Sequence, residues 1–151
     1  MSYPAGQAPA EVLLVEDDPG DALIIQEASG EHAIRNVLHV VTDGEQALQF
    51  LRREGRFGDA PRPGLMLLDL NLPRRNGLEV LAEVRADAEI ASIPIVMLTT
   101  SKAPEDILRS YQLHASAYLT KPAGYDKFIA AAGSIDGFYL RLARLPAAPA
   151  N

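Results

Sequence analysis

Short apolar runs alternate with amphipathic helical segments along this chain, and that alternation limits its fold more than any other feature. The runs are rich in Val, Leu and Ile, and each is followed by polar residues: Val12–Val15, Val37–Val41, Leu65–Leu68, Ile95–Leu98 and Tyr118–Thr120. Uninterrupted apolar strands are typical of parallel sheets that are covered on both faces. We therefore predict an α/β domain with five parallel strands and helices on both sides of the sheet.

The segments between the runs carry helix start signals. Asp18 and Asp43 can cap a helix, because their carboxylates accept hydrogen bonds from free backbone N–H groups. Gln46 follows Asp43 at the spacing of a capping box, and Pro19 and Pro104 suit the first position of a helix. The predicted helices are about Pro19–Ser29, a segment from Asp43, a segment through Leu78, Leu81 and Val84, a segment from Pro104, and Tyr125–Leu145. Residues 55–64, with Gly, Pro and Arg, form a loop.

Composition excludes several classes of protein. The 151 residues suit one domain, which we place at residues 11–145 between a flexible lead, 1–10, and a flexible tail, 146–151. The net charge of −6 argues against a nucleic-acid partner. The absence of Cys excludes disulfides and thiolate metal sites, and it fits a cytoplasmic location. No stretch approaches the roughly 18 apolar residues of a membrane span, and the N-terminus is not a secretory signal.

Polar residues with complementary chemistry stand at the ends of four predicted strands. In chain order they are Glu16, Asp17 and Asp18, then Asp69, then Thr99, and finally Lys121. Taken singly, a strand-end Asp is usually a turn or cap residue, and a Thr or Lys there usually belongs to a turn or the surface. Because the carboxyl ends of parallel strands meet at one edge of the sheet, we expect these side chains to form one site.

The residue types predict phosphoryl transfer to a carboxylate. Crowded carboxylates repel one another, so a cation is expected among them, and oxygen ligands without His or Cys favour Mg²⁺. Asp69 is then a nucleophile that forms an acyl phosphate. Lys121 would give a positive charge to one phosphoryl oxygen, and Thr99 would donate a hydroxyl hydrogen bond to another. Such positioning and charge neutralisation are most of what phosphoryl transfer needs.

Four motifs also carry a family resemblance: Val15-Glu16-Asp17, Leu68-Asp69-Leu70-Asn71-Leu72-Pro73, Leu98-Thr99-Thr100-Ser101 and Tyr118-Leu119-Thr120-Lys121-Pro122. Over about Glu11–Leu145 the chain resembles the response-regulator receiver domains of bacterial two-component systems. The resemblance implies a flavodoxin-like, doubly wound sheet in the order 2-1-3-4-5 with five helices. It also implies a signalling protein rather than an enzyme, limited to self-phosphorylation from phosphohistidine and autodephosphorylation.

The same resemblance implies roles for individual residues. Asp69 would be the phosphoacceptor, Thr99 and Tyr118 the switch pair, and Lys121 the base that senses phosphate. The implied ligands of Mg²⁺, or of Mn²⁺ in its place, are Glu16, Asp17, Asp69 and the backbone carbonyl of Asn71. Many members have Asp where this chain has Glu16, which leaves open whether Glu16 binds the metal directly or through water. A cis peptide bond is expected between Lys121 and Pro122.

A narrower resemblance is to the small regulators paired with bacterial phytochromes. It rests on Leu14–Asp21, Phe50–Gly55, Leu98–Lys102 and Ile107–Tyr111. It implies that the phosphodonor is a sensor histidine kinase of the bacteriophytochrome type. Ala123, Gly124 and Tyr125 depart from the acidic or apolar residues expected after the Lys-Pro pair.

Three other functions compete with this interpretation. A phosphatase of the haloacid-dehalogenase type would carry its nucleophile on the first strand, whereas Asp69 follows the third. An inert interaction module would not need Asp17, Asp69, Thr99 and Lys121 together. A nucleotide-binding flavodoxin-like protein would need a Gly-rich loop after the first strand, and none is present.

The last predicted helix suggests how the chain assembles. Its apolar residues advance by four and three positions, which is the spacing of a helix-packing seam. Phe138, Leu142 and Leu145 would extend beyond the sheet and form an interface. We expect a symmetric homodimer through the helix from Pro104, the strand at Tyr118–Thr120 and the last helix. The sequence leaves no room for an effector domain after Leu145, so output is expected to pass through protein contacts.

Overall fold

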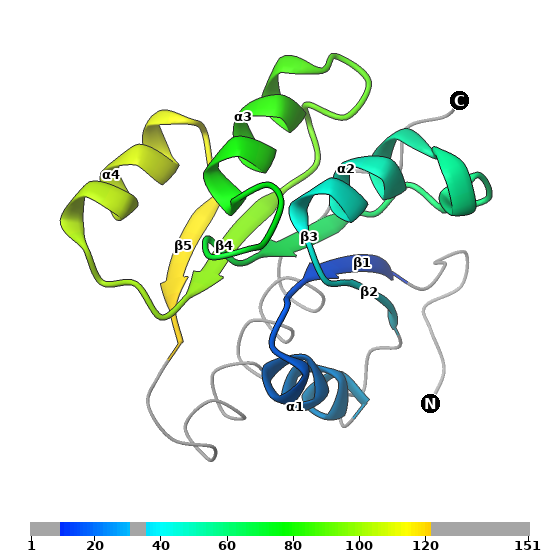
Figure 1. Ribbon diagram of the computed structural model, residues 1–151, viewed down its shortest axis with the longest axis horizontal. Helices are drawn as coiled ribbons and strands as arrows, with labels where there is room; N and C mark the ends of the chain where they lie inside the picture. Colours follow the sequence, from blue (N-terminus) through cyan, green and yellow to red (C-terminus); the bar gives the residue numbers. More distant parts are fainter. Residues whose placement is uncertain (1–9, 31–35, 122–151) are drawn as a thin grey trace, which may run out of the picture.

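The computed structural model describes residues 10–30 and 36–121, which form a five-stranded parallel sheet covered by helices (Figure 1). The strands are β1 (Ala10–Val15), β2 (Asn36–Val41), β3 (Leu65–Leu68), β4 (Ile95–Thr99) and β5 (Ala117–Thr120). They lie in the order β2-β1-β3-β4-β5, and every neighbouring pair is parallel. The predicted α/β class and strand order are confirmed.

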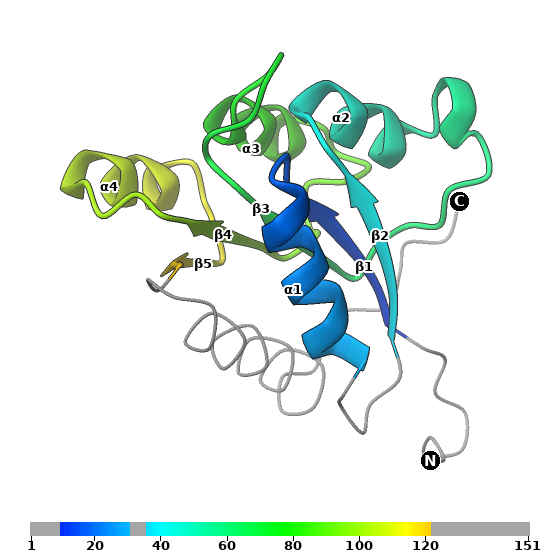
Figure 2. The same cartoon turned by 60° about the horizontal axis from the view of Figure 1, so that its bottom comes forward.

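Helices connect the strands. They are α1 (Pro19–Gly30), α2 (Gly44–Arg52), α3 (Gly77–Ala86) and α4 (Pro104–Gln112), and a short 3₁₀ turn, η1 (Gly55–Phe57), lies within the predicted loop. Figures 1 and 2 show α2 and α3 on one face of the sheet and α1 on the other, with α4 beside α3 toward the β5 edge. The fifth predicted helix, Tyr125–Leu145, lies outside the described residues. None of the described helices is both long and apolar enough to cross a membrane.

Alternate residues of the central strands fill two separate apolar cores. Leu13 and Met66 belong to the core beneath α2 and α3, together with Leu48, Leu51, Val80 and Leu81. Leu14 and Leu67 belong to the core on the α1 side, together with Ala22, Ile24 and Ile25. Because successive strand side chains point to opposite faces, a strand that is apolar throughout must be covered on both sides. The central strands are therefore fixed in place, and their polar ends with them.

The predicted helix starts are found at the expected residues, with one difference. The Asp18 carboxylate accepts from the backbone N–H of Gly20 at 2.8 Å, and α1 begins at Pro19. Asp43 caps α2 by accepting from the Gln46 N–H at 2.7 Å. The Gln46 side chain, however, accepts from the N–H of Thr42 rather than from that of Asp43. The capping box proper lies at α3, between Asn76 and Glu79.

Candidate functional site

A cluster of carboxylates lies at the carboxyl ends of β1 and β3. Glu16 and Asp17 follow β1, Asp69 follows β3, and each offers an oxygen within 4.8 Å of the others. Glu16 and Asp69 are buried, whereas Asp17 is exposed. Crowded carboxylates repel one another, and hard oxygen donors are the ligands that divalent cations of the Mg²⁺ type prefer. The donor set therefore fits a divalent metal ion.

Lys121 brings a positive charge to the same place. Its Nζ donates to Glu16 Oε1, to Asp21 Oδ2 at 3.0 Å and to Asp69 Oδ2 at 3.0 Å. Only 6% of Lys121 is exposed, and its backbone N–H donates to the carbonyl of Thr99 at 2.7 Å. The end of β5 thus carries the ammonium across to the acids that follow β1 and β3.

Burial and charge act against each other in this cluster. Burial raises the pKa of Glu16 to about 7, even though the hydrogen bond and charge of Lys121 act to lower it. Burial would lower the pKa of Lys121, but the hydrogen bond to Glu16 and the charges of Asp69 and Glu16 outweigh it and raise that pKa. The ammonium is therefore protonated at neutral pH, and it compensates part of the negative charge around Asp69.

The backbone fixes the position of Asp69. Its N–H donates to the carbonyl of Val15 at 3.2 Å, and its Oδ1 accepts from the N–H of Asn71 at 3.2 Å. The start of α3 packs directly on this segment, because a Cβ on Gly77 would lie 2.2 Å from the carbonyl oxygen of Asp69. Only glycine allows so close an approach. Asn71 is exposed beside the cluster.

Thr99 and Tyr118 lie on neighbouring strands. Thr99 ends β4 and is completely buried, and its Oγ1 accepts from the Ser101 N–H at 3.4 Å. The Tyr118 hydroxyl donates to the carbonyl of Ser101 at 2.8 Å. Burial raises the pKa of Tyr118, and Asp106 and Asp69 add to the effect while a hydrogen bond with the Ser101 side chain opposes it. The phenol is thus a neutral donor at physiological pH.

Most of the predicted site residues come together, and one partner was missed. Glu16, Asp17, Asp69 and Lys121 form the cluster, and Asn71 lies beside Asp69. Thr99 is joined to Lys121 through the backbone, because its carbonyl accepts from the Lys121 N–H. Sequence reasoning gave no role to Asp21, although it stands in the first turn of a helix that leaves the predicted site. Phe138, Leu142 and Leu145, like the Lys121–Pro122 bond, lie outside the described residues.

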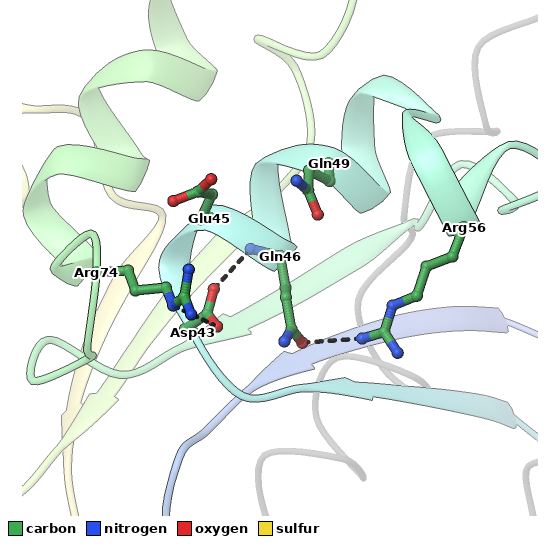
Figure 3. A pocket seen from close by; sticks show the side chains of 6 residues that line it. All are labelled: Asp43, Glu45, Gln46, Gln49, Arg56 and Arg74. Atoms are coloured by element: carbon green, nitrogen blue, oxygen red, sulfur yellow. Dashed lines mark hydrogen bonds and ion pairs between the residues drawn. The ribbon is translucent and has the colours of Figure 1, made fainter.

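A separate hollow of about 260 Å³ lies along α2 and shares no residue with the carboxylate cluster (Figure 3). Its lining is Asp43, Glu45, Gln46, Gln49, Arg56 and Arg74. Arg74 Nε lies 3.7 Å from Asp43 Oδ2, and Arg56 Nη2 donates to Gln46 Oε1 at 3.2 Å. Each arginine thus has a partner within the hollow, and no chemistry of the strand-end site depends on it.

Comparison with known proteins identifies the family. The response regulator receiver domain profile matches residues 12–133. This chain belongs to the response regulator receiver domain family. The predicted resemblance is therefore confirmed, and the phosphatase alternative is not supported.

Individual relatives match over almost the whole chain. Response regulator Rcp1 of Synechocystis sp. is 41% identical over 140 residues, which are 93% of this chain and 95% of Rcp1. The crystal structure of Mn²⁺-bound Rcp1 has a TM-score of 0.89 at 40% identity and covers 92% of this chain and 100% of that one. The phosphorylated cyanobacterial phytochrome response regulator RcpA has a TM-score of 0.90 at 41% identity, covering 93% and 100%. The chain is thus a response regulator related to phytochrome response regulators.

Proposed function

We propose that this regulator accepts a phosphoryl group on Asp69 from the phosphohistidine of a sensor histidine kinase. The observation that carries the proposal is the placement of Asp69: it is buried, it lies 3.0 Å from the Lys121 ammonium, and two further carboxylates are close enough to share a metal ion with it. A lone buried carboxylate would be protonated or neutralised. An ammonium on one side and a cation site on the other favour the charged form of a carboxylate, which is the form that acts as a nucleophile.

The chain's own side chains account for the transfer. A carboxylate oxygen of Asp69 forms a bond to phosphorus while the phosphorus–nitrogen bond to the kinase imidazole breaks, and the imidazole leaves and takes up a proton. Lys121 pairs with one oxygen of the arriving group, and the Thr99 hydroxyl donates to another. The product is an acyl phosphate on Asp69, which water later hydrolyses to restore the carboxylate and release inorganic phosphate.

We propose Mg²⁺ as the metal. Glu16, Asp17, Asp69 and the backbone carbonyl of Asn71 would hold it. When bound, Mg²⁺ neutralises the negative charge that gathers between the phosphoryl oxygens and the carboxylates. The crowding of three carboxylates within 4.8 Å supports this assignment, and Mn²⁺ is bound by the related Rcp1. Glu16 is held by Lys121, which favours contact with the metal through water for that residue.

The phosphodonor that fits best is a phytochrome-type photoreceptor kinase in the cytoplasm. The similarity to RcpA, a phytochrome response regulator, supports this partner. The signal would leave the chain through protein contacts rather than through nucleic acid, in keeping with the net charge of −6. We further propose a homodimer through α4, β5 and the segment that carries Phe138, Leu142 and Leu145.

The test is labelling of Asp69. Purified chain is incubated with Mg²⁺ and a small phosphodonor such as phosphoramidate, and the phosphorylated fraction is followed by a mobility-shift gel and by mass spectrometry. Asp69→Asn should not be labelled, whereas Asp59→Asn, a change of the same kind at an exposed loop position, should be labelled like wild type. Equal labelling of wild type and Asp69→Asn would rule out Asp69 as the acceptor.

A further inference from the structure

Three carboxylates share the Lys121 ammonium, and one of them does not belong to the metal cluster. Glu16 and Asp69 belong to both groups of contacts. Asp21 contacts Lys121 at 3.0 Å, and it is not among the residues that could hold the ion. Asp21 lies in the first turn of α1, and 100 positions in the chain separate it from Lys121.

The difference between Asp21 and the other two carboxylates becomes important when a metal ion and a phosphoryl group occupy the site. A divalent cation would compete with Lys121 for the oxygens of Glu16 and Asp69, because both belong to the proposed metal site. A phosphoryl group on Asp69 turns that carboxylate into an acyl phosphate, whose negative charge lies on the phosphoryl oxygens, and Lys121 then pairs with one of them. Two of the three carboxylates that contact Lys121 among the described residues are therefore engaged elsewhere during the proposed reaction. The third, Asp21, takes no part in the metal cluster or in the transfer.

The surroundings of Asp21 fix its direction. The Asp18 carboxylate accepts from the backbone N–H of Gly20 at 2.8 Å and from that of Asp21 at 3.3 Å. This cap holds the first turn of α1 in place, while Ala22, Ile24 and Ile25 bury the same helix against the sheet. The side chain of Asp21 is 26% exposed, and that of Lys121 only 4%. A well-anchored acid thus holds a buried ammonium.

We propose that Asp21 is a positioning residue for Lys121: it holds Nζ beside the acceptor oxygen while Glu16 and Asp69 are engaged by the metal and the phosphoryl group. This inference rests on the proposed function of Asp69. Asp21 does not touch the reacting atoms and acts through Lys121. A lysine side chain has several rotatable bonds, so an ammonium that loses its fixed partner spends less time in the productive position. Transfer from a phosphodonor then slows.

The first measurement tests the contact between Asp21 and the Lys121 ammonium in the absence of metal and phosphodonor. The chain has three lysines, Lys102, Lys121 and Lys127, so the side-chain ammonium groups can be resolved by ¹⁵N NMR. Burial and hydrogen bonding slow the exchange of ammonium protons with water. Lys121 should give a slowly exchanging signal, which Lys121→Arg identifies by its loss. Asp21→Ala should speed that exchange about tenfold, the effect of losing one charge-assisted hydrogen bond.

The second measurement reads the consequence. Labelling of Asp69 by phosphoramidate with Mg²⁺ should be about tenfold slower in Asp21→Ala than in wild type, at saturating donor. Asp21→Asn, which keeps a side-chain oxygen for Lys121, should recover part of the rate. Asp59→Asn is the control: it removes one negative charge at an exposed loop position outside the site, so it should behave like wild type.

The outcomes separate the two proposals. Wild-type labelling together with equally fast labelling of Asp21→Ala would overturn the positioning role of Asp21, whatever the ammonium signal does. An unchanged Lys121 signal in Asp21→Ala would overturn the contact. A slowing of Asp59→Asn as large as that of Asp21→Ala would also overturn the proposal, because it would trace the effect to net charge rather than to the Lys121 contact. Wild type that is never labelled would instead contradict the proposed function, a result that the ammonium measurement does not depend on.

Discussion

The hydroxyl of Tyr118 donates to the carbonyl of Ser101 at 2.8 Å, and this bond ties β5 to the loop between β4 and α4. The other end of the same residue is also held, because its backbone N–H donates to the Tyr111 hydroxyl at 3.1 Å. The Ser101 hydroxyl in turn donates to the Asp106 carboxylate in α4 at 2.5 Å. Tyr118 is thus connected to both ends of α4, directly through Tyr111 and through Ser101 to Asp106.

The Tyr111 contact predicts a local change in hydrogen exchange. Tyr111→Phe removes the acceptor of the Tyr118 N–H and leaves the exposed ring, 49% of which faces solvent, in place. The Tyr118 amide should then exchange about tenfold faster, as expected for the loss of one hydrogen bond. Amide exchange followed by NMR measures this. Tyr118→Phe is the matched variant: it removes the bond to Ser101 and should leave the Tyr118 amide protected, so equal deprotection in both would contradict the assignment.

The switch role of Thr99 and Tyr118 stays a prediction, and a phosphate mimic tests it. With beryllofluoride on Asp69, the Thr99 hydroxyl should turn toward the bound group, and the Ser101 N–H that now donates to Thr99 Oγ1 should lose that partner. Amide shifts of Ser101 and Tyr118 should change together. The comparison is the same addition to Asp69→Asn, which should give no shift. Unchanged Ser101 and Tyr118 signals in the mimic-bound wild type would refute the coupling.

Close packing at Gly77 predicts a loss of stability. In Gly77→Ala the new Cβ would lie 2.2 Å from the carbonyl of Asp69, a backbone atom that cannot move aside easily. Overpacking of this kind costs about 1–3 kcal/mol in the free energy of unfolding. Gly58→Ala is the control, because its Cβ would meet nothing nearer than 3.7 Å. Urea unfolding measures both, and a Gly77→Ala variant as stable as Gly58→Ala would show that the α3 start can shift away from Asp69.

The central sheet and the acid cluster could be predicted from sequence because each depends on local pattern plus one topological rule. The apolar run Leu65–Leu68 must be a buried strand, and a parallel strand places Asp69 at the same edge as Glu16. The contact between Asp21 and Lys121 could not be predicted in this way. It depends on the angle at which α1 leaves the sheet and on how a long side chain turns, and neither follows from periodicity.

The hydrogen-bond partners of Tyr118 could not be predicted from the sequence either. A tyrosine on a predicted strand indicates a half-buried position, but its partner depends on how the β4–α4 loop folds. That loop is stabilised by the side chain of Ser101, whose neighbours in sequence give no sign of a bond to Asp106. Chemistry at strand ends follows from topology, whereas contacts made by loops follow from tertiary packing.

The last prediction concerns the charge that Lys121 supplies. In Lys121→Met, three carboxylates that share this ammonium, Glu16, Asp21 and Asp69, lose their common partner. Removing one member of a buried ion pair costs about 3–5 kcal/mol, because the remaining charge is left uncompensated. A bound cation would replace part of the lost charge.

Saturating Mg²⁺ should therefore raise the free energy of unfolding more in Lys121→Met than in wild type, since the metal binds more tightly where no ammonium competes with it. Urea unfolding with and without Mg²⁺ measures the difference, and Lys102→Met, at an exposed position, is the control. If Mg²⁺ stabilises wild type and Lys121→Met equally, the ammonium and the metal do not share the same carboxylates.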